Sequence, residues 1–221
     1  MTRIVHLLAS GLLVILAIPG ATRAQQGQLV DRVVAIVSGT IVTMTDARAA
    51  LELGFVDAAG ADDPVAVAVG WLVDRQLILE EAARYGTAPP EPAQVDEAIE
   101  ALRSRDATAQ AFDDRLTRLG LSEGDLRMLV RHDLLARSYV DRRFDATLAV
   151  TENEAQEYYR LRVDRFVREG RLLSFDEARK AVYEALARDR RERALADWLA
   201  RLRRRAELSI LYGGHREGGQ R

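Results

Sequence analysis

The sequence predicts a mainly α-helical fold: a multi-helix module with a small β-sheet formed by an N-terminal hairpin and a C-terminal strand. One observation is a long helical segment, 63–86, that is apolar around most of its circumference. A second is that other long segments are rich in Ala, Leu, Arg and Glu, which favour helix. The third is that short, strand-like stretches lie near both ends, 29–45 and 206–212. Because a lone two-stranded hairpin is marginal in water, we expect the two chain ends to meet in one sheet.

The composition excludes several classes of protein. Of the 221 residues, 48% are hydrophobic and 30% are charged, which is typical of a globular chain and not of a disordered one. The formal net charge of -2 gives no support to nucleic-acid binding. The chain contains no cysteine, which excludes disulfides, thiolate metal sites and a thiol nucleophile.

Residues 1–24 have the pattern of a signal peptide. Arg3 precedes an apolar run, Ile4 to Ile18, and Pro19-Gly20 ends it. Small residues before Ala24 predict cleavage after that residue, which directs the protein to the periplasm. The run is shorter than the roughly 20 residues that span a bilayer, so we expect no stable membrane insertion, with a retained anchor as the alternative.

A stretch near the start of the predicted mature chain is rich in β-branched residues. Residues 29–45 predict a hairpin that turns at Ser38-Gly39-Thr40. Thr45 is expected to cap a brief helix from Asp46 to about Leu53, which Gly54 ends.

The segment from Asp63 to Gly86 predicts the central helix. Asp63 is a good N-cap, Pro64 suits the first helical position, and Gly86 suits the residue after the last turn. Its apolar surface is so wide that other elements must cover more than one side of it. The alternative is an ordinary amphipathic surface helix.

Three further helices are expected between residues 92 and 144. They run from about Pro92 to Ser104, from a cap at Thr108 to Gly120, and from a cap at Ser122 to about Phe144. The loops between them are short, so these helices should pack as neighbours.

Two capping boxes mark the last helices. Thr151 opens a helix that is expected to reach about Val167, and residues 168–173 break it. Ser174 opens a long helix to about Arg205, which the strand 206–212 follows. The module thus spans 25–212, with an N-terminal part, 25–167, and a returning helix and strand, 174–212. Residues 213–221 form a polar tail that is expected to be disordered.

No residue pattern predicts catalysis, a cofactor or a metal site. The histidines are His6, His132 and His215, and no two have the spacing of metal ligands. No serine lies in a nucleophile elbow, and no glycine-rich loop precedes a helix as a phosphate cradle. One charged run holds eight arginines between Arg188 and Arg205. It fits either a surface for an anion, lipid headgroup or acidic partner, or a solvated helix face near a C-terminus.

Four segments resemble the SurA-type periplasmic chaperones. Residues 29–43, LVDRVVAIVSGTIVT, resemble the strand–turn–strand that opens the mature proteins of that family. Residues 72–79, LVDRQLIL, and 151–159, TENEAQEYY, resemble two of its helices. Residues 175–212 resemble the helix and strand that return to the N-terminal part. These segments follow one another in the family's order over nearly the whole of 25–212.

The chain departs from the family at one place. SurA-type chaperones usually carry one or two parvulin prolyl-isomerase domains between the last two helices, where this chain has only 168–173. The resemblance therefore implies the chaperone module without the isomerase, and so a protein that is not an enzyme and needs no cofactor.

The resemblance implies an ATP-independent chaperone that binds unfolded exported polypeptides, outer-membrane proteins among them, in an apolar groove between helices. Candidate peptide-binding residues are Phe55, Phe112, Leu116 and Met128, each of which also fits a role in the core. The alternatives are a divergent prolyl-isomerase-family protein and an assembly subunit that holds one fixed partner.

Overall fold

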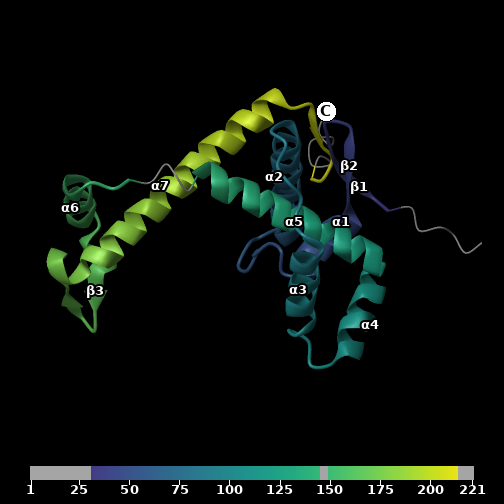
Figure 1. The fold of residues 1–221 in the computed structure, drawn as a ribbon, viewed down its shortest axis with the longest axis horizontal. Helices are drawn as coiled ribbons and strands as arrows, with labels where there is room; N and C mark the ends of the chain where they lie inside the picture. Colours follow the sequence, from purple (N-terminus) through teal and green to yellow (C-terminus); the bar gives the residue numbers. More distant parts are fainter. Residues whose placement is uncertain (1–30, 145–148, 214–221) are drawn as a thin grey trace, which may run out of the picture. The chain divides into compact units, whose positions relative to one another are not determined.

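The structure is a computed structural model and describes residues 31–144 and 149–213. The predicted signal peptide, residues 29–30 of the predicted hairpin stretch and 214–221 of the predicted tail lie outside these residues. Within them, the fold is mainly α-helical with a small antiparallel sheet built from both ends of the chain (Figure 1). The predicted fold class is confirmed.

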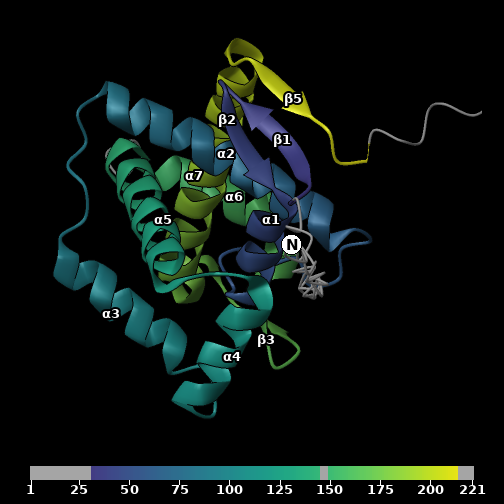
Figure 2. The same ribbon diagram turned by 90° about the vertical axis from the view of Figure 1, so that its right-hand side faces the viewer.

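The sheet contains three strands in the order β2-β1-β5 (Figure 2). Strands β1 (Val33–Val37) and β2 (Thr40–Thr43) form the hairpin, and β5 (Leu208–Ile210) pairs with the other edge of β1. Ser38 and Gly39 make the turn with φ values of 47° and 84°, which a tight hairpin between twisted strands requires. The Ser38 N–H donates to the Glu207 carbonyl over 2.8 Å. The two ends of the described chain therefore meet in one sheet, as the sequence predicts.

Helix α1 (Met44–Glu52) begins earlier than predicted, because its cap is Thr43 and not Thr45. The Thr43 N–H donates to Asp46 Oδ2 over 2.8 Å, and the Asp46 N–H donates to Thr43 Oγ1 over 3.2 Å. This reciprocal capping box needs an acceptor three residues after the cap. Thr43 has Asp46 at that position, whereas Thr45 has Arg48.

Helix α2 (Pro64–Arg84) is the central helix. Asp63 caps it, with Oδ1 accepting from the Ala66 N–H over 3.0 Å, and Gly86 follows it at a φ of 62°. It contacts α1, α5, α7 and both hairpin strands. Its buried apolar side chains are Ala68, Val69, Leu72, Val73, Leu77, Ile78 and Ala82. The wide apolar surface is thus covered on several sides, as expected.

Helices α3 (Pro92–Arg103), α4 (Ala109–Leu119) and α5 (Glu123–Phe144) follow their predicted bounds closely. Thr108 caps α4, and Gly120 ends it at a φ of 70°. With α1 these helices enclose one core of Ala49, Leu53, Val95, Ile99, Leu102, Phe112, Leu116, Leu119, Leu126, Leu129 and Val130.

The predicted helix 151–167 is wrong at its end. Helix α6 (Glu152–Leu161) stops at Leu161, and a short 3-10 helix, η2 (Val163–Phe166), follows. Strands β3 (Val167–Arg168) and β4 (Arg171–Leu172) then form a hairpin that turns the chain back, and the Leu173 N–H donates to the Phe166 carbonyl over 2.9 Å. The tighter turn lets the buried Phe166 ring pack on Tyr158 and Tyr159, at centroid distances of 6.3 and 5.6 Å.

Helix α7 (Phe175–Arg205) begins at the predicted capping box of Ser174 and Glu177. Its first half shares a core with α6 and η2, made of Ala155, Tyr158, Phe166, Ala178, Val182 and Leu186. Its second half packs on α2 and α5 through the buried Trp198 and Leu202. Across 31–144 and 149–213, no helix combines the length and apolarity needed to cross a bilayer.

Candidate functional site

A cavity of about 370 Å³ lies where α2, α5 and α7 come together. Its volume falls within the range of pockets that take small molecules or parts of peptides. We call it the interhelical groove. Its apolar lining is Trp71, Ile78, Ala136, Val140, Leu195 and Leu199, and its polar lining is Asp74, Arg75, Asp133, Arg137 and Asp141.

Large apolar side chains of the groove stay partly open to solvent. Leu195 and Leu199 are half-buried and, four residues apart on α7, lie on the same helix face. Trp71 is also half-buried, and its ring stacks on Phe55 at 6.2 Å with an interplanar angle of 20°. The groove therefore offers apolar surface that the core does not fully cover.

Ion pairs fix the edges of the groove. Arg203 Nε of α7 lies 2.6 Å from Asp74 Oδ1 of α2, and Arg203 Nη2 donates to the Gly70 carbonyl over 3.1 Å. Arg191 of α7 pairs with Asp141 of α5. These contacts join α7 to both neighbouring helices, so they set the width of the groove.

The ion pair of Asp133 and Arg137 includes a carboxylate that is more buried than those at the edges of the groove. Asp133 is 7% exposed, and its Oδ2 lies 2.8 Å from Arg137 Nε. Burial raises the pKa of Asp133, whereas the charges of Arg137 and Arg75 lower it. The Arg75 guanidinium lies 4.9 Å from the centre of the Trp71 ring. Burial lowers the pKa of Arg75. Arg75 Nη1 is buried without a hydrogen-bond partner among the described residues, so the groove holds an unused donor.

The structure separates the four predicted peptide-binding residues. Phe112 and Leu116 are buried in the core that α1, α3, α4 and α5 enclose, and Phe55 packs against that core and Trp71. Met128 is 51% exposed on α5, outside that core. None of the four lines the interhelical groove. The wide apolar surface of 63–86 is the sequence signal that points to Trp71 and Ile78, whereas the spacing of Leu195 and Leu199 does not distinguish them from core residues.

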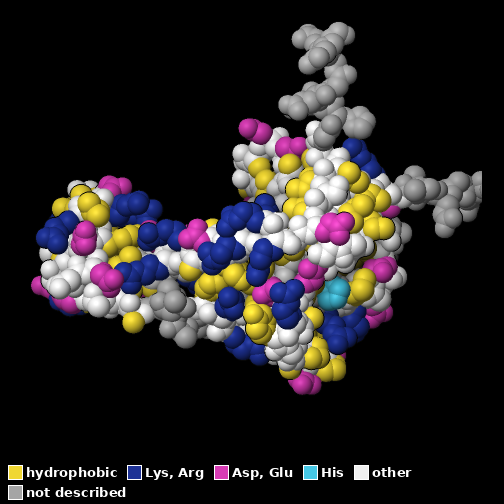
Figure 3. Space-filling model, turned by 90° about the horizontal axis from the view of Figure 1, so that it is seen from above, with side chains coloured by type: hydrophobic (Ala, Val, Ile, Leu, Met, Phe, Trp, Pro, Cys, Tyr) yellow, Lys and Arg dark blue, Asp and Glu magenta, His cyan; other side chains and the backbone are white. Residues whose placement is uncertain are grey.

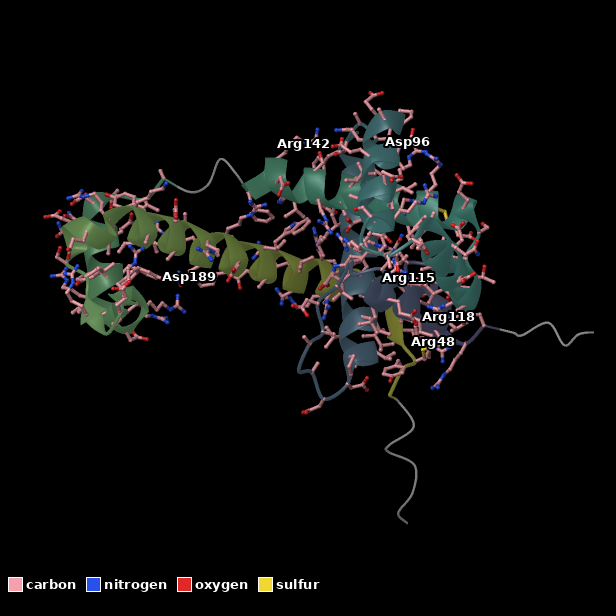
Figure 4. The ribbon with its side chains drawn as sticks, turned by 90° about the horizontal axis from the view of Figure 1, so that it is seen from below. Arg48, Asp96, Arg115, Arg118, Arg142 and Asp189 are labelled. Carbon is pink, nitrogen blue, oxygen red and sulfur yellow. The ribbon has the colours of Figure 1, made fainter. Side chains whose placement is uncertain are left out.

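A second cavity, of about 750 Å³, lies between α6 and α7 and is lined mainly by charged side chains. Tyr158 Oη donates to Asp189 Oδ2 over 2.8 Å, and Arg165 Nη1 lies 3.2 Å from the same oxygen (Asp189 is labelled in Figure 4). Several of its charges pair with one another, and a smaller fraction of its lining is apolar than in the interhelical groove. In the described part of the chain, no three His, Asp or Glu side chains gather as metal ligands would.

The fold of the described residues, mainly helical with both of their ends in one small sheet, is similar to that of a solved SurA-like chaperone. No family model matches the chain, and no curated protein matches it. Among solved structures, it is similar to a chain from a study describing PEB4, a virulence factor, and Cj1289, a periplasmic protein, as SurA-like chaperones of Campylobacter jejuni. The similarity has a TM-score of 0.52 at 12% identity and covers 82% of this chain and 100% of the other.

Proposed function

We propose that this protein is a periplasmic, ATP-independent chaperone that binds unfolded polypeptides in the interhelical groove. The observation that carries the proposal is the half-buried apolar surface of Trp71, Leu195 and Leu199 within a frame of ion pairs. The SurA-like fold supports the same function. A periplasmic location and outer-membrane proteins as clients follow from the predicted signal peptide and from the resemblance in sequence.

The chemistry of the groove suits weak and reversible binding. A client's aromatic or aliphatic side chain that enters it gains about 1.5 to 3 kcal/mol from burial. Binding of this strength reverses without ATP, since no single contact is strong.

A non-catalytic role is part of the proposal. The chain between α6 and α7 forms η2 and the β3–β4 hairpin, whose strands have two residues each. This supports a module without an isomerase domain between those helices. Phe55 and Met128 remain proposed additional contacts, whereas Phe112 and Leu116 contribute only if the core around them opens.

The test is the aggregation of a urea-denatured outer-membrane β-barrel, diluted with and without residues 25–221. We expect suppression that rises with protein concentration and is absent with an inert protein of similar size. Leu195→Ser should weaken it about fivefold, because burial of about 1 kcal/mol is lost. Leu161→Ser is the matched control, because Leu161 is 72% exposed on α6 outside the groove.

Two results would overturn the proposal. One is the absence of suppression over a range of clients, which would favour the subunit that holds one fixed partner. The other is isomerase activity on an Xaa-Pro peptide well above that of a heat-killed control. Circular dichroism of both variants confirms that a change in suppression does not come from unfolding.

A further inference from the structure

Six of the eight arginines in the run of α7 fall into two groups in the structure. Arg190 lies 2.5 Å from Glu154, Arg203 lies 2.6 Å from Asp74, and Arg191 pairs with Asp141. These three arginines join α7 to α6, α2 and α5. By contrast, Arg201, Arg204 and Arg205 form no ion pair with a carboxylate of the described residues.

The second group converges on a cleft with an arginine of α5. The cleft has a volume of about 310 Å³ and is lined by Arg143, Arg201, Arg204 and Arg205. We call it the arginine cleft. Figure 3 shows Lys and Arg side chains gathering in the middle of one face of the molecule, around the region where α7 passes α5.

Aromatic rings form the walls of the arginine cleft. Trp198 is buried, and the Arg143 guanidinium lies 5.1 Å from the centre of its ring. Tyr85 is 65% exposed and stacks on Tyr139 at 6.5 Å, and Tyr139 in turn lies 6.0 Å from Trp198. Stacking on an aromatic face holds a guanidinium in place and leaves its N–H donors free for a ligand.

The charge in the cleft is not balanced. Glu81 is the one carboxylate among its lining residues, and it lies 2.9 Å from Arg84, which is outside the lining. Four guanidinium groups therefore surround a recess whose single carboxylate is already paired. Guanidinium groups bind carboxylates and phosphates through two parallel hydrogen bonds, so the ligand that fits is an oxyanion.

We propose that the arginine cleft binds the carboxylates of an acidic segment in a polypeptide client. This inference rests on the proposed function, since Asp and Glu are the oxyanions that an unfolded chain carries. The recess suits a side chain that enters it, and Tyr85 offers an exposed ring to an apolar residue beside the acidic ones. A membrane surface fits less well, because part of the charge lies inside a recess with aromatic walls.

The experiment compares two labelled peptides by fluorescence anisotropy with residues 25–221. Both carry the same stretch of Leu and Phe, followed in one by a run of Glu and in the other by a run of Gln. We expect the Glu peptide to bind about tenfold more tightly at low ionic strength, with the difference shrinking as salt is added. The double variant R201Q/R204Q should abolish this difference and leave binding of the Gln peptide within about twofold.

The control is R48Q/R118Q, which removes the same charge from exposed arginines of α1 and α4 (labelled in Figure 4). It should retain the difference between the peptides. Equal binding of both peptides to the unchanged protein overturns the inference and leaves the proposed function standing. Failure of both peptides to bind overturns both.

A second experiment, with anionic vesicles, tests whether the arginine cleft binds a lipid headgroup instead. Binding to phosphatidylglycerol vesicles that R201Q/R204Q abolishes, with no preference for the Glu peptide, would assign the cleft to a lipid headgroup and overturn the inference. Thermal unfolding of the variants checks their fold, which should persist because Arg201 and Arg204 are exposed.

Discussion

Replacement of Trp198 by alanine should destabilise the protein by about 4 kcal/mol, because this ring holds α7 on α2 and α5. The side chain is 3% exposed and contacts Phe144 edge to face at 5.6 Å and Tyr139 at 6.0 Å. Removal of a buried Trp side chain costs about 3 to 5 kcal/mol, and each aromatic pair adds about 0.5 to 1.5 kcal/mol beyond the area that it buries.

The matched variant is Trp71→Ala, which removes the other tryptophan of the chain. Trp71 is half-buried in the interhelical groove and stacks on Phe55, so its loss should cost only about 1 to 2 kcal/mol. Trp71→Ala should nevertheless reduce suppression of client aggregation, because it removes apolar surface that faces the groove.

Urea unfolding followed by far-UV circular dichroism measures both free energies, since each variant lacks one of the two tryptophans on which a fluorescence signal would depend. Equal losses of stability in the two variants would contradict the assignment of Trp198 to the core and Trp71 to the groove. A loss below about 1 kcal/mol for Trp198→Ala would show that this ring does not hold α7 in place.

Three further predictions concern caps, turns and the buried pair. The pKa of Glu154 is lowered to about 2, chiefly by its hydrogen bond with Arg190. The ionised Glu154 side chain therefore stabilises the folded protein fully above pH 4.5, and this stabilisation is lost as the pH falls through about 2. Glu154→Gln should make the free energy of unfolding depend less on pH in that window. Gly120→Ala should cost about 1 kcal/mol in urea unfolding, because its φ is 70° although a Cβ there meets no atom within 4 Å; no loss would refute this. Asp133→Ala should cost about 2 kcal/mol at pH 7 by the same assay, because it removes a buried carboxylate that pairs with Arg137 and attracts the half-buried Arg75, and increased stability would contradict that role.

Local signals in the sequence predict most of the helices. Caps at Asp63, Thr108, Ser122, Thr151 and Ser174 are each followed by a helix that begins at the next residue. These signals depend on hydrogen bonds within three residues, so the sequence alone contains them. The pairing of β5 with β1 is also predictable, because a hairpin without a third strand is unstable.

The predictions that differ from the structure depend on contacts between distant elements or on a choice between neighbours. Helix α6 ends at Leu161 because Phe166 packs on Tyr158 and Tyr159 in the core that α7 completes. Thr43 and Thr45 were both possible caps of α1. Only Thr43 has an acceptor, Asp46, three residues later, and this pair forms the capping box.

The groove could not be located from periodicity alone. Residues that line it, such as Leu195 and Leu199, have the same spacing as core residues. Phe112 is the opposite case: it is predicted to bind peptide but lies in the core. Its position on an amphipathic helix fits either role. Which side chains stay open depends on how α7 lies against α2 and α5, and no single segment contains that information.

Site-specific photo-crosslinking tests the client-binding groove most directly. A photoreactive amino acid at Leu195 or Leu199 is compared with one at Leu161 or Val167, which are exposed apolar positions outside the groove. With an unfolded outer-membrane β-barrel as the client, we expect crosslinks from the two groove positions and few from the other two. Crosslinks only from Leu161 and Val167, or equal crosslinks from all four positions, would contradict binding in the interhelical groove.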